Sequence, residues 1–420
     1  MNPDPGIQRR LPELISEEYA YLEGLYRYFH SHPELSGQEK ETSARLAKEL
    51  EAAGFSVSRG IGGYGIIGIL KNGDGPVVMA RADMDALPLS EETGLPYASA
   101  VRMKDPSGKE VDVMHACGHD IHMTVLAGTA RILTRMKKEW SGTLMFIGQP
   151  SEETVSGAEK MIHEGIYSRF GRPDYGLALH VGPEQPAGTI GYREGIFSAG
   201  SESLDIIVHG IGGHAAHPDQ TKDPVVIAAQ IILALQTIVS REVPPAEFAV
   251  ITVGSVHGGI KHNAIPDSVD LQVNLRYFKP EIRDLLLSSV GRVCTGIAAA
   301  SGIPESLMPS VTVLNESVMP MWNDPEFTIR VAAALEEGLG KENVVRIAKL
   351  TGSEDFGVFG MAEPPVPLCY FRIGTGIPGK DEPAEKKTYL HSSRFAPFPE
   401  GVLPLGIRAM TIAILESLKK

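Results

Sequence analysis

The hydrophobic and polar positions of the N-terminal half follow two different periods. Apolar residues recur at helical spacing in 19–29 and 39–53, whereas short continuous apolar runs at 66–70 and 77–80 are typical of buried strands. Asparagine, glycine and proline at 72–76 predict a turn that joins these two strands. The alternation of strands and helices continues well beyond them, which predicts an α/β sheet domain.

Side chains that can bind a metal or carry a proton follow the predicted carboxyl ends of three strands. Open α/β sheets hold their ligands at this edge, and three such ends are harder to obtain by chance than one. The residues are Asp83 and Asp85 after 77–80, Glu152 and Glu153 after 143–147, and His180 after 175–179. We therefore expect a functional site at the carboxyl edge of the sheet.

The pattern changes after the first half of the chain to that of a smaller, self-contained unit. Asp223 and Pro224 supply an N-cap and a first-turn proline to a long apolar helix. The predicted elements are a strand at 203–209, a helix at 224–241, strands at 248–256 and 269–278, and a helix at 280–300. This order is typical of a ferredoxin-like fold. We therefore predict a two-domain α/β protein in which residues 198–310 form a ferredoxin-like (βαββα) lid and dimerisation domain, inserted into a catalytic domain of residues 1–197 plus 311–420.

Composition and charge exclude several classes of function. The chain has 420 residues, 43% of them hydrophobic, and a formal net charge of −13, which disfavours nucleic acid and anionic membranes as partners. Residues 1–10 contain no apolar signal region, and the most apolar run, 225–235, is too short for a bilayer. Three widely spaced cysteines, Cys117, Cys294 and Cys369, argue against a disulfide framework. We expect a cytoplasmic protein in which Cys294 and Cys369 are core thiols.

A short segment rich in cysteine and histidine carries the most candidate chemistry, with Cys117 and His119 on either side of Gly118. A thiolate and an imidazole two residues apart can bind one cation where the backbone between them is not helical, and glycine permits the tight geometry that this needs. Alone, the segment could equally be a redox cysteine or a chance run of histidines. We expect His115 and His122, at its flanks, to be helix-entry or supporting residues.

Seven short motifs are spread over nearly the whole chain. They are RADMDALP at 81–88, HACGHD at 115–120, SEE at 151–153, GGHAA at 212–216, NAIPD at 263–267, SEDF at 353–356 and LHS at 390–392. With these motifs the chain resembles the M20 metallopeptidase family, and most closely its N-acyl-amino-acid amidohydrolases, which include hippurate hydrolases and the plant auxin-conjugate hydrolases. Any one motif is weak, but seven in the right order are specific.

The resemblance implies a pair of divalent metal ions. Their ligands would be Cys117, His119, Glu153, His180 and His391. Thiolate, imidazole and carboxylate donors suit zinc and its late first-row neighbours, and two such ions ~3.5–4 Å apart can clamp both a water molecule and the scissile carbonyl. Relatives commonly work with other metals, so we expect manganese or zinc, with cobalt and nickel as alternatives.

The resemblance also implies roles for residues beside the metals. Glu152 would be the general base that takes a proton from the attacking water and passes it to the leaving amine. Asp85 would orient a ligating histidine, with Asp83 as a second candidate for this task. Glu354 and Asp355 either face the substrate or cap the helix that follows them.

Three residues of the predicted lid are implied in substrate contacts. His214 follows a glycine run at a strand end, from which its imidazole could reach a developing oxyanion; in the family the equivalent histidine often comes from the partner subunit. Asn263 and Arg276 resemble residues near the substrate's carboxylate, although Arg276 could equally serve a structural ion pair. Many relatives carry a histidine after the proline of this loop, whereas here His217 precedes that proline and Asp219 follows it. We therefore expect a local shift in substrate contacts.

These observations predict a dinuclear-metal amidohydrolase that cleaves N-acyl amino acids, with an aliphatic or aromatic acyl group, into a carboxylic acid and a free amino acid. The apolar helix at 225–239 favours a homodimer formed through the lid, with a tetramer as the alternative. Three rival hypotheses stay open. They are a dipeptidase or aminopeptidase on the same scaffold, a hydrolase that uses Cys117 as nucleophile with His119, and a metal-dependent binding protein that has lost catalysis.

Overall fold

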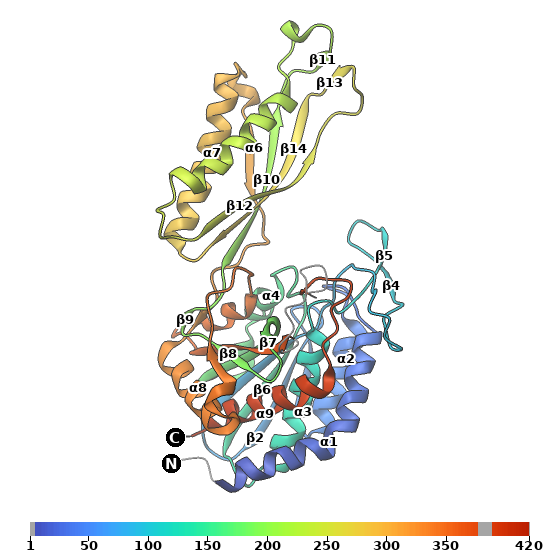
Figure 1. Ribbon diagram of the computed structural model, residues 1–420, viewed down its shortest axis with the longest axis vertical. Coiled ribbons are helices and arrows are strands. Elements are labelled where there is room, and N and C mark those ends of the chain that lie inside the picture. Colours follow the sequence, from blue (N-terminus) through green and yellow to red (C-terminus); the bar gives the residue numbers. More distant parts are fainter. Residues whose placement is uncertain (1–4, 377–388, 420) are drawn as a thin grey trace. The chain divides into compact units, whose positions relative to one another are not determined.

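The computed structural model describes residues 5–376 and 389–419 (Figure 1). The chain divides into two compact units. Unit 1 consists of Met1–Phe197, Trp322–Lys349 and Asp355–Lys420, and unit 2 of Ser198–Met321 and Leu350–Glu354. The boundary after Phe197 coincides with the predicted one, whereas the chain returns to unit 1 later than predicted.

A large mixed sheet forms the centre of unit 1. Its described strands lie in the order β1-β2-β6-β3-β7-β18-β8-β17, and the four adjacent strands β6, β3, β7 and β18 are parallel to one another. The bounds are β1 Ser56–Ile61, β2 Gly65–Asn72, β3 Val77–Asp83, β6 Gly142–Gln149, β7 Tyr175–Pro186, β8 Ile190–Tyr192, β17 Val344–Arg346 and β18 Leu368–Gly376. Central parallel strands are buried on both faces, so their sequences are continuous apolar runs that can be recognised without a structure.

The strands β2 and β3 follow one another along the chain but are not neighbours in the sheet. The turn at 72–76 joins them as predicted, yet β6 lies between them, antiparallel to β2 and parallel to β3. Strand pairing between segments more than 60 residues apart therefore decides the order of the sheet, and local turn chemistry does not reveal it.

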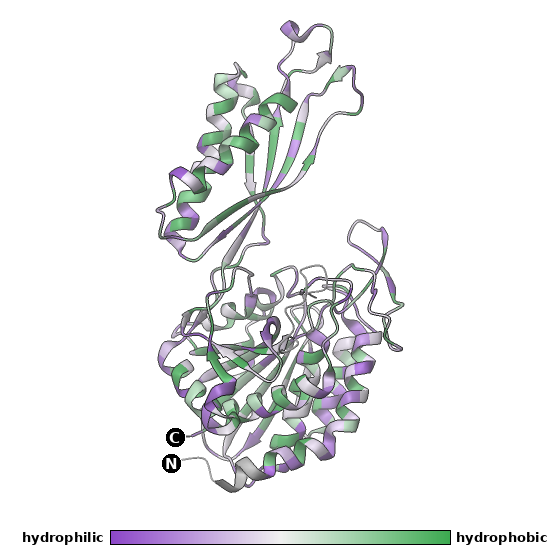
Figure 2. Cartoon of the chain, in the orientation of Figure 1, coloured by the Kyte–Doolittle hydropathy of each residue, from purple (hydrophilic) through white to green (hydrophobic). Residues whose placement is uncertain are grey.

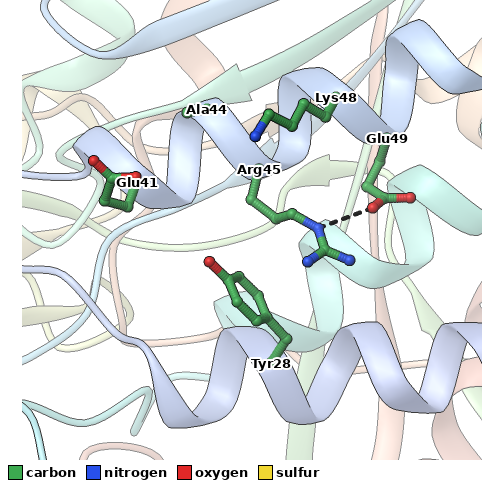
Figure 3. Close-up of a pocket in the computed structure, with 6 residues that line it drawn as sticks. All are labelled: Tyr28, Glu41, Ala44, Arg45, Lys48 and Glu49. Atoms are coloured by element: carbon green, nitrogen blue, oxygen red, sulfur yellow. Dashed lines mark hydrogen bonds and ion pairs between the residues drawn. The ribbon is translucent and has the colours of Figure 1, made fainter.

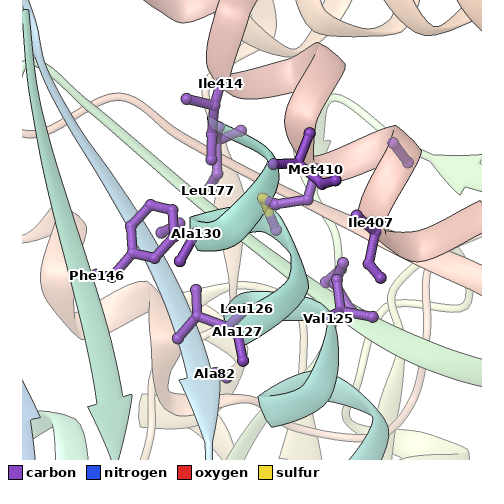
Figure 4. Packing of buried hydrophobic residues seen from close by; sticks show 14 of the residues in the cluster. Ala82, Val125, Leu126, Ala127, Ala130, Phe146, Leu177, Ile407, Met410 and Ile414 are labelled. Carbon is purple, nitrogen blue, oxygen red and sulfur yellow. The ribbon is translucent and has the colours of Figure 1, made fainter. Parts of the chain in front are cut away.

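The helices of unit 1 pack on this sheet and on one another. They are α1 Pro5–Ser31, α2 Lys40–Ala52, α3 His119–Arg135, α4 Gly157–His163, α5 Ile166–Phe170, α8 Pro325–Leu339 and α9 Pro399–Ser417. α3 and α9 contact each other through buried side chains that include Val125, Ile407 and Met410 (Figure 4). Each helix also presents a glycine to the other. A Cβ atom at Gly128 would lie 2.6 Å from Ile407 Cδ1, and one at Gly406 would lie 2.8 Å from Val125 Cγ2.

Unit 2 is an antiparallel sheet on which two helices pack. The described strands lie in the order β12-β14-β10-β15. The bounds are β10 Gly200–His209, α6 Pro224–Arg241, β12 Ala249–His257, β14 Ser268–Tyr277, α7 Pro280–Ala300 and β15 Ser310–Val313. β15 completes the β-α-β-β-α-β order of a ferredoxin-like fold. Because β15 pairs with β10, the segment that begins at residue 310 belongs to unit 2, and the predicted return to the first domain at residue 311 was wrong.

α6 begins where its capping residues predicted. Asp223 accepts a hydrogen bond from the Val225 backbone N–H at 2.9 Å, and Pro224 occupies the first turn. Among the described helices, only α6 is long and apolar enough to cross a membrane, although a third of it is buried within the structure and such a helix is weak evidence for a span. The prediction from the sequence considered only the apolar run at 225–235, which is too short to cross a bilayer. In the structure Ile231 and Leu235 pack in the core of unit 2. Figure 2 shows the hydrophobic residues along this helix.

Short elements occupy the loops of both units. Three pairs of small strands lie beside each other, namely β4 Arg102–Lys104 with β5 Glu110–Asp112, β9 Gly195–Ile196 with β16 Trp322–Asn323, and β11 Gly213–His214 with β13 Ala264–Ile265. The described 3-10 helices are η1 Pro218–Gln220, η2 Glu305–Leu307, η3 Lys341–Asn343 and η4 Asp355–Gly360.

Candidate metal centre

The five predicted metal ligands lie together in unit 1, near the carboxyl ends of its parallel strands. Cys117 and His119 stand at the start of α3, and Glu153 follows β6. His180 is part of β7, and His391 lies in the loop between β18 and α9. The structure thus brings residues far apart in the sequence to one edge of the sheet, where open α/β sheets place their sites.

The donor atoms form two groups that share the cysteine. Cys117, His119 and His180 make one group, and Cys117, Glu153 and His391 make the other, with the donor atoms of each group within 4.8 Å of one another. Cys117 Sγ lies 3.3 Å from His180 Nε2. The Glu153 carboxylate reaches towards both groups, with one oxygen 3.9 Å from His119 Nε2 and the other 3.4 Å from His391 Nε2. Two overlapping sets of three donors fit a pair of cations.

Unsatisfied atoms provide an independent test of this fit. Within the described part of the chain, His119 Nε2 and Glu153 Oε1 are buried and have no hydrogen-bond partner. His119 Nδ1 donates to the Asp85 backbone carbonyl at 2.8 Å, and His180 Nδ1 donates to the Val181 carbonyl at 2.7 Å. Each imidazole is therefore held in the tautomer whose Nε2 lone pair faces the other donors. Buried polar atoms without partners need an explanation, and divalent cations between these donors supply one.

The electrostatics of the site also favour a cation. Burial, with Glu153 and Glu152 nearby, raises the pKa of the Cys117 thiol well above its usual range. Although burial opposes it, the carboxylates of Asp83 and Asp85 raise the pKa of His119 to about 10. A cysteine nucleophile needs a lowered pKa, so the surroundings of Cys117 argue against the cysteine-hydrolase hypothesis. A bound cation is what would restore the thiolate.

His122 supports the site and does not offer a donor atom to it. It lies within 4.8 Å of Asp83 and His119, yet both of its ring nitrogens are engaged. Nδ1 donates to Asp83 at 2.6 Å, and Nε2 accepts from the Val181 backbone N–H at 3.1 Å. Asp83 in turn accepts from Arg81 at 2.7 Å. This chain of bonds ties α3 to β3 and β7 immediately beneath the ligands.

Asp85 lies beside the ligand His119, as predicted, and has a second task. Its carboxylate lies 3.5 Å from His119 Nδ1, whereas the shorter bond to this histidine comes from the backbone carbonyl of Asp85. The two carboxylate oxygens accept from the backbone N–H groups of Glu152 at 3.1 Å and Glu153 at 2.9 Å. The hydroxyl of Ser36 donates to one of them at 2.7 Å. Asp85 therefore orients both the histidine and the turn that carries Glu152 and Glu153.

The backbone around the site is strained. In the part of the chain that the structure describes, three non-glycine residues have a positive φ, namely Ser151 at 55°, Val155 at 46° and His391 at 63°. Each such residue costs about 1–3 kcal/mol and persists where the surroundings determine the conformation. Gly118 also has a φ of 84°, and a Cβ atom there would lie 2.4 Å from Val181 Cγ2. This supports the prediction that the glycine permits the geometry of the Cys117–His119 segment.

Asp355 joins three elements in the interior of unit 1. It is buried, and its carboxylate accepts from Arg81 at 3.0 Å, from Gln149 at 2.8 Å and from the Ala158 backbone N–H at 3.1 Å. These bonds join β3, β6 and α4. One Asp355 oxygen also lies within 4.8 Å of a Glu152 carboxylate oxygen, so the predicted choice between capping the following helix and facing the substrate stays a prediction.

The remaining candidates lie in unit 2. His214 on β11 and Asn263, which immediately precedes β13, are exposed, and the Asn263 carbonyl accepts from the Ala215 N–H at 3.2 Å. Arg276 on β14 donates to the Asn274 side chain at 2.7 Å and to the hydroxyl of Ser353. The predicted residues thus fall into two sets, one in each unit.

Two residues just before α2 support the site and were not predicted from the sequence. Ser36 bonds Asp85, and Glu39 accepts a hydrogen bond from the Ser151 backbone N–H. In the sequence this segment looks like an ordinary helix start. The contact with Ser151 joins residues 112 positions apart, and no local pattern signals it.

An α/β domain that gathers thiolate, imidazole and carboxylate donors beside a further glutamate defines a metal-dependent hydrolase. The family model described as peptidase family M20/M25/M40 matches residues 79–414. The chain is 36% identical over 362 residues to the IAA-amino acid hydrolase ILR1-like 2 of Arabidopsis thaliana, covering 85% of this chain and 79% of the relative. It is 35% identical over 355 residues to the hippurate hydrolase of Campylobacter jejuni, covering 83% and 87%.

A solved structure shares the whole architecture. The crystal structure of a Bacillus subtilis protein described as a dinuclear metal-binding peptidase of the M20 family superposes with a TM-score of 0.76 at 30% sequence identity, covering 96% of this chain and 99% of that one. This chain belongs to peptidase family M20/M25/M40. The resemblance inferred from the seven motifs is confirmed, as is the two-domain α/β fold class.

Proposed function

We propose that the protein hydrolyses the amide bond of N-acyl amino acids, aliphatic or aromatic in the acyl group. The observation that carries the proposal is the position of Glu152. It adjoins the ligand Glu153 on a turn held by Asp85, and its carboxylate lies 3.9 Å from His119 Nε2, beside the metal donors. Relatives named as hydrolases of hippurate and of IAA-amino acids support this substrate class.

The residues of this chain divide the chemistry among them. When bound, two divalent cations held by Cys117, His119, Glu153, His180 and His391 polarise the amide carbonyl and acidify water. Glu152 takes a proton from the attacking water as the new C–O bond forms. It then gives this proton to the amide nitrogen as the C–N bond breaks. The products are a carboxylic acid and a free amino acid.

His214 is suited to stabilise the oxyanion of the tetrahedral intermediate. Its Nδ1 accepts a hydrogen bond from the Ala216 backbone N–H at 3.0 Å, so in the neutral ring the proton lies on Nε2, which can donate. Whether it acts in its own chain or in a partner's stays open. Asn263 and Arg276 stay predictions as residues that bind the substrate's carboxylate.

The metal, the location and the assembly belong to the same proposal. We propose manganese or zinc as the native metals, with cobalt and nickel as alternatives, because the donors combine thiolate, imidazole and carboxylate. We propose a cytoplasmic location, which the odd number of widely spaced cysteines supports, and the three of them are free and buried in the structure. Exposed Val226 and Leu233 on α6 support a homodimer formed through unit 2, with a tetramer as the alternative.

Substrate profiling tests the proposed activity. The protein is stripped with a chelator and reconstituted separately with zinc, manganese and cobalt. Each form is assayed for amino-acid release from N-acetyl and N-benzoyl amino acids and from dipeptides. We expect metal-dependent release from the acyl substrates. Turnover of dipeptides alone would make the protein a peptidase. Metal uptake with substrate binding but no turnover would identify a binding protein.

A further inference from the structure

Glu39 is a buried glutamate that neither the family match nor the proposed chemistry uses. It stands immediately before α2 and is fully buried. A glutamate at this place would be expected to interact with the free N–H groups of its own helix. Here Glu34 accepts from the Glu41 and Thr42 N–H groups at 3.2 and 2.8 Å. Within the described structure, the Glu39 side chain makes no capping bond to α2.

The Glu39 carboxylate instead points to the turn that carries the candidate base. One oxygen, Oε1, accepts from the backbone N–H groups of Gly37 and Ser151, both at 2.8 Å. Asp85 binds the next two N–H groups along the chain, those of Glu152 and Glu153. Three consecutive amides are therefore held by two buried carboxylates.

Ser151 is the residue of this turn that most needs support. Its φ of 55° is unfavourable for a non-glycine residue. Its carbonyl accepts from the Ser156 and Gly157 N–H groups, each at 3.2 Å, so both of its backbone polar groups are engaged. Without Glu39 the buried N–H of Ser151 would lose its partner, and buried amides are almost always paired. The turn would then relax towards a conformation that points the side chains of Glu152 and Glu153 elsewhere.

We propose that Glu39 is a positioning residue that holds Ser151 in its left-handed conformation, and so keeps Glu153 in reach of the metal donors and Glu152 beside them. The kinetic part of this inference rests on the proposed hydrolase function. Its metal-binding part rests only on the contacts of Glu153 with His119 and His391.

Because one oxygen of Glu39 is unpaired, two substitutions can separate the loss of the hydrogen bond to Ser151 from the loss of the charge. Among the described residues Oε2 has no hydrogen-bond partner, so Glu39→Gln replaces it with an amide group while Oε1 still accepts from Ser151. Burial and the nearby Asp85 raise the pKa of Glu39 to about 7, which makes the neutral glutamine a close mimic. Glu39→Ala removes the acceptor altogether.

Glu49 supplies a matched control on the same helix. It is a buried glutamate whose carboxylate accepts from Arg45 at 2.9 Å (Figure 3). The same carboxylate accepts from the hydroxyl of Tyr21. Its partners lie on α1 and α2, away from the turn. Glu49→Ala therefore also removes a buried carboxylate from α2, but without touching Ser151.

The test measures Co²⁺ binding to the chelator-stripped full chain, together with kcat and KM for N-benzoylglycine or whichever acyl substrate the wild type hydrolyses. Loss of a residue that supports metal ligands typically costs about 10–100-fold in affinity or activity. We expect Glu39→Ala to lose this much in Co²⁺ affinity and in kcat with little change in KM, and Glu39→Gln and Glu49→Ala to stay within about threefold of wild type.

Three results would overturn the inference. They are wild-type Co²⁺ affinity in Glu39→Ala, an equal loss in Glu39→Gln, and an equal loss in Glu49→Ala. If the wild type hydrolyses no acyl substrate, the proposed function fails, but the Co²⁺ measurement still decides the role of Glu39.

Discussion

At the scale of single residues, backbone groups orient the metal donors as much as side chains do. His119 and His180 are each fixed by a bond from Nδ1 to a backbone carbonyl, and Asp85 and Glu39 bind backbone amides of the base-bearing turn. The identity of the ligands could be inferred from the motifs because their side chains carry the chemistry. The bonds of Asp85 to the Glu152 and Glu153 amides and the contact of Glu39 with Ser151 could not, because both depend on the conformation of distant loops.

His30 is a second buried group that stabilises the start of α3. Its Nδ1 lies 2.7 Å from the Asp120 carboxylate and its Nε2 lies 3.0 Å from that of Glu91. Although burial opposes it, these two carboxylates raise the pKa of His30 to about 10. The imidazolium therefore joins α1 to α3 and to the loop that carries Glu91. Breaking a buried ion pair by removing one partner costs about 3–5 kcal/mol.

We expect His30→Gln to lower the free energy of unfolding by about this amount at pH 6, and by less as the pH rises. Because the folded pKa of His30 lies above the ordinary histidine pKa of 6.5, the stabilisation is fully present below pH 6.5 and is lost as the pH rises through about 10. Urea unfolding of wild type and variant at pH 6, 8 and 10 measures the difference. A gap that widens with pH would contradict the account.

At the scale of elements, close glycine contacts set the packing of α3 against α9. A Cβ atom at Gly128 would lie 2.6 and 2.9 Å from two carbons of Ile407 and 3.1 Å from Leu22. We expect Gly128→Val to destabilise unit 1 by about 1–3 kcal/mol, because overpacking forces side chains out of their preferred rotamers. Thermal or urea unfolding measures the effect.

Gly24, in the neighbouring helix α1, is the control. A Cβ atom there would meet no described atom within 4 Å, so Gly24→Ala should stabilise the helix by up to about 1 kcal/mol. An unfolding free energy unchanged by Gly128→Val, or a loss of stability in Gly24→Ala, would refute the packing argument.

The elements themselves differ in how well a single sequence predicts them. The starts of α6 and α7 were predicted to the residue, since Asp223–Pro224 and Pro280 mark them, and their ends were predicted approximately. The sheet of unit 2 was predicted without β15, a four-residue edge strand that pairs with β10. In unit 1 the position of β6 between β2 and β3 is a long-range property that no turn or periodicity encodes.

At the scale of the whole molecule, unit 2 offers an apolar face for self-association. Val225, Val226 and Leu233 of α6 have 47%, 53% and 72% of their surface exposed, although the same helix contributes its other side to the core of unit 2. Exposed apolar residues gathered on one helix mark an interaction surface more often than chance. The sequence prediction of a homodimer formed through this unit stays a prediction.

Light scattering coupled to gel filtration tests the dimer. We expect a mass twice the 45.2 kDa of one chain for the wild type. Leu233→Glu should shift the protein towards monomer, because it places a charge in the centre of the apolar face. A monomeric wild type, or a Leu233→Glu variant that is as dimeric as the wild type, would exclude this interface.

The most direct test of the central claim compares the wild type with Glu152→Gln. The substitution keeps the size of the side chain but removes its capacity to accept a proton, and it leaves the five metal donors in place. We expect Co²⁺ uptake to stay at the wild-type level while kcat for N-acyl amino acids falls by about 10²–10⁴-fold, the usual contribution of a general base. Co²⁺ uptake and kcat both close to wild type would contradict the assignment of Glu152 as the base.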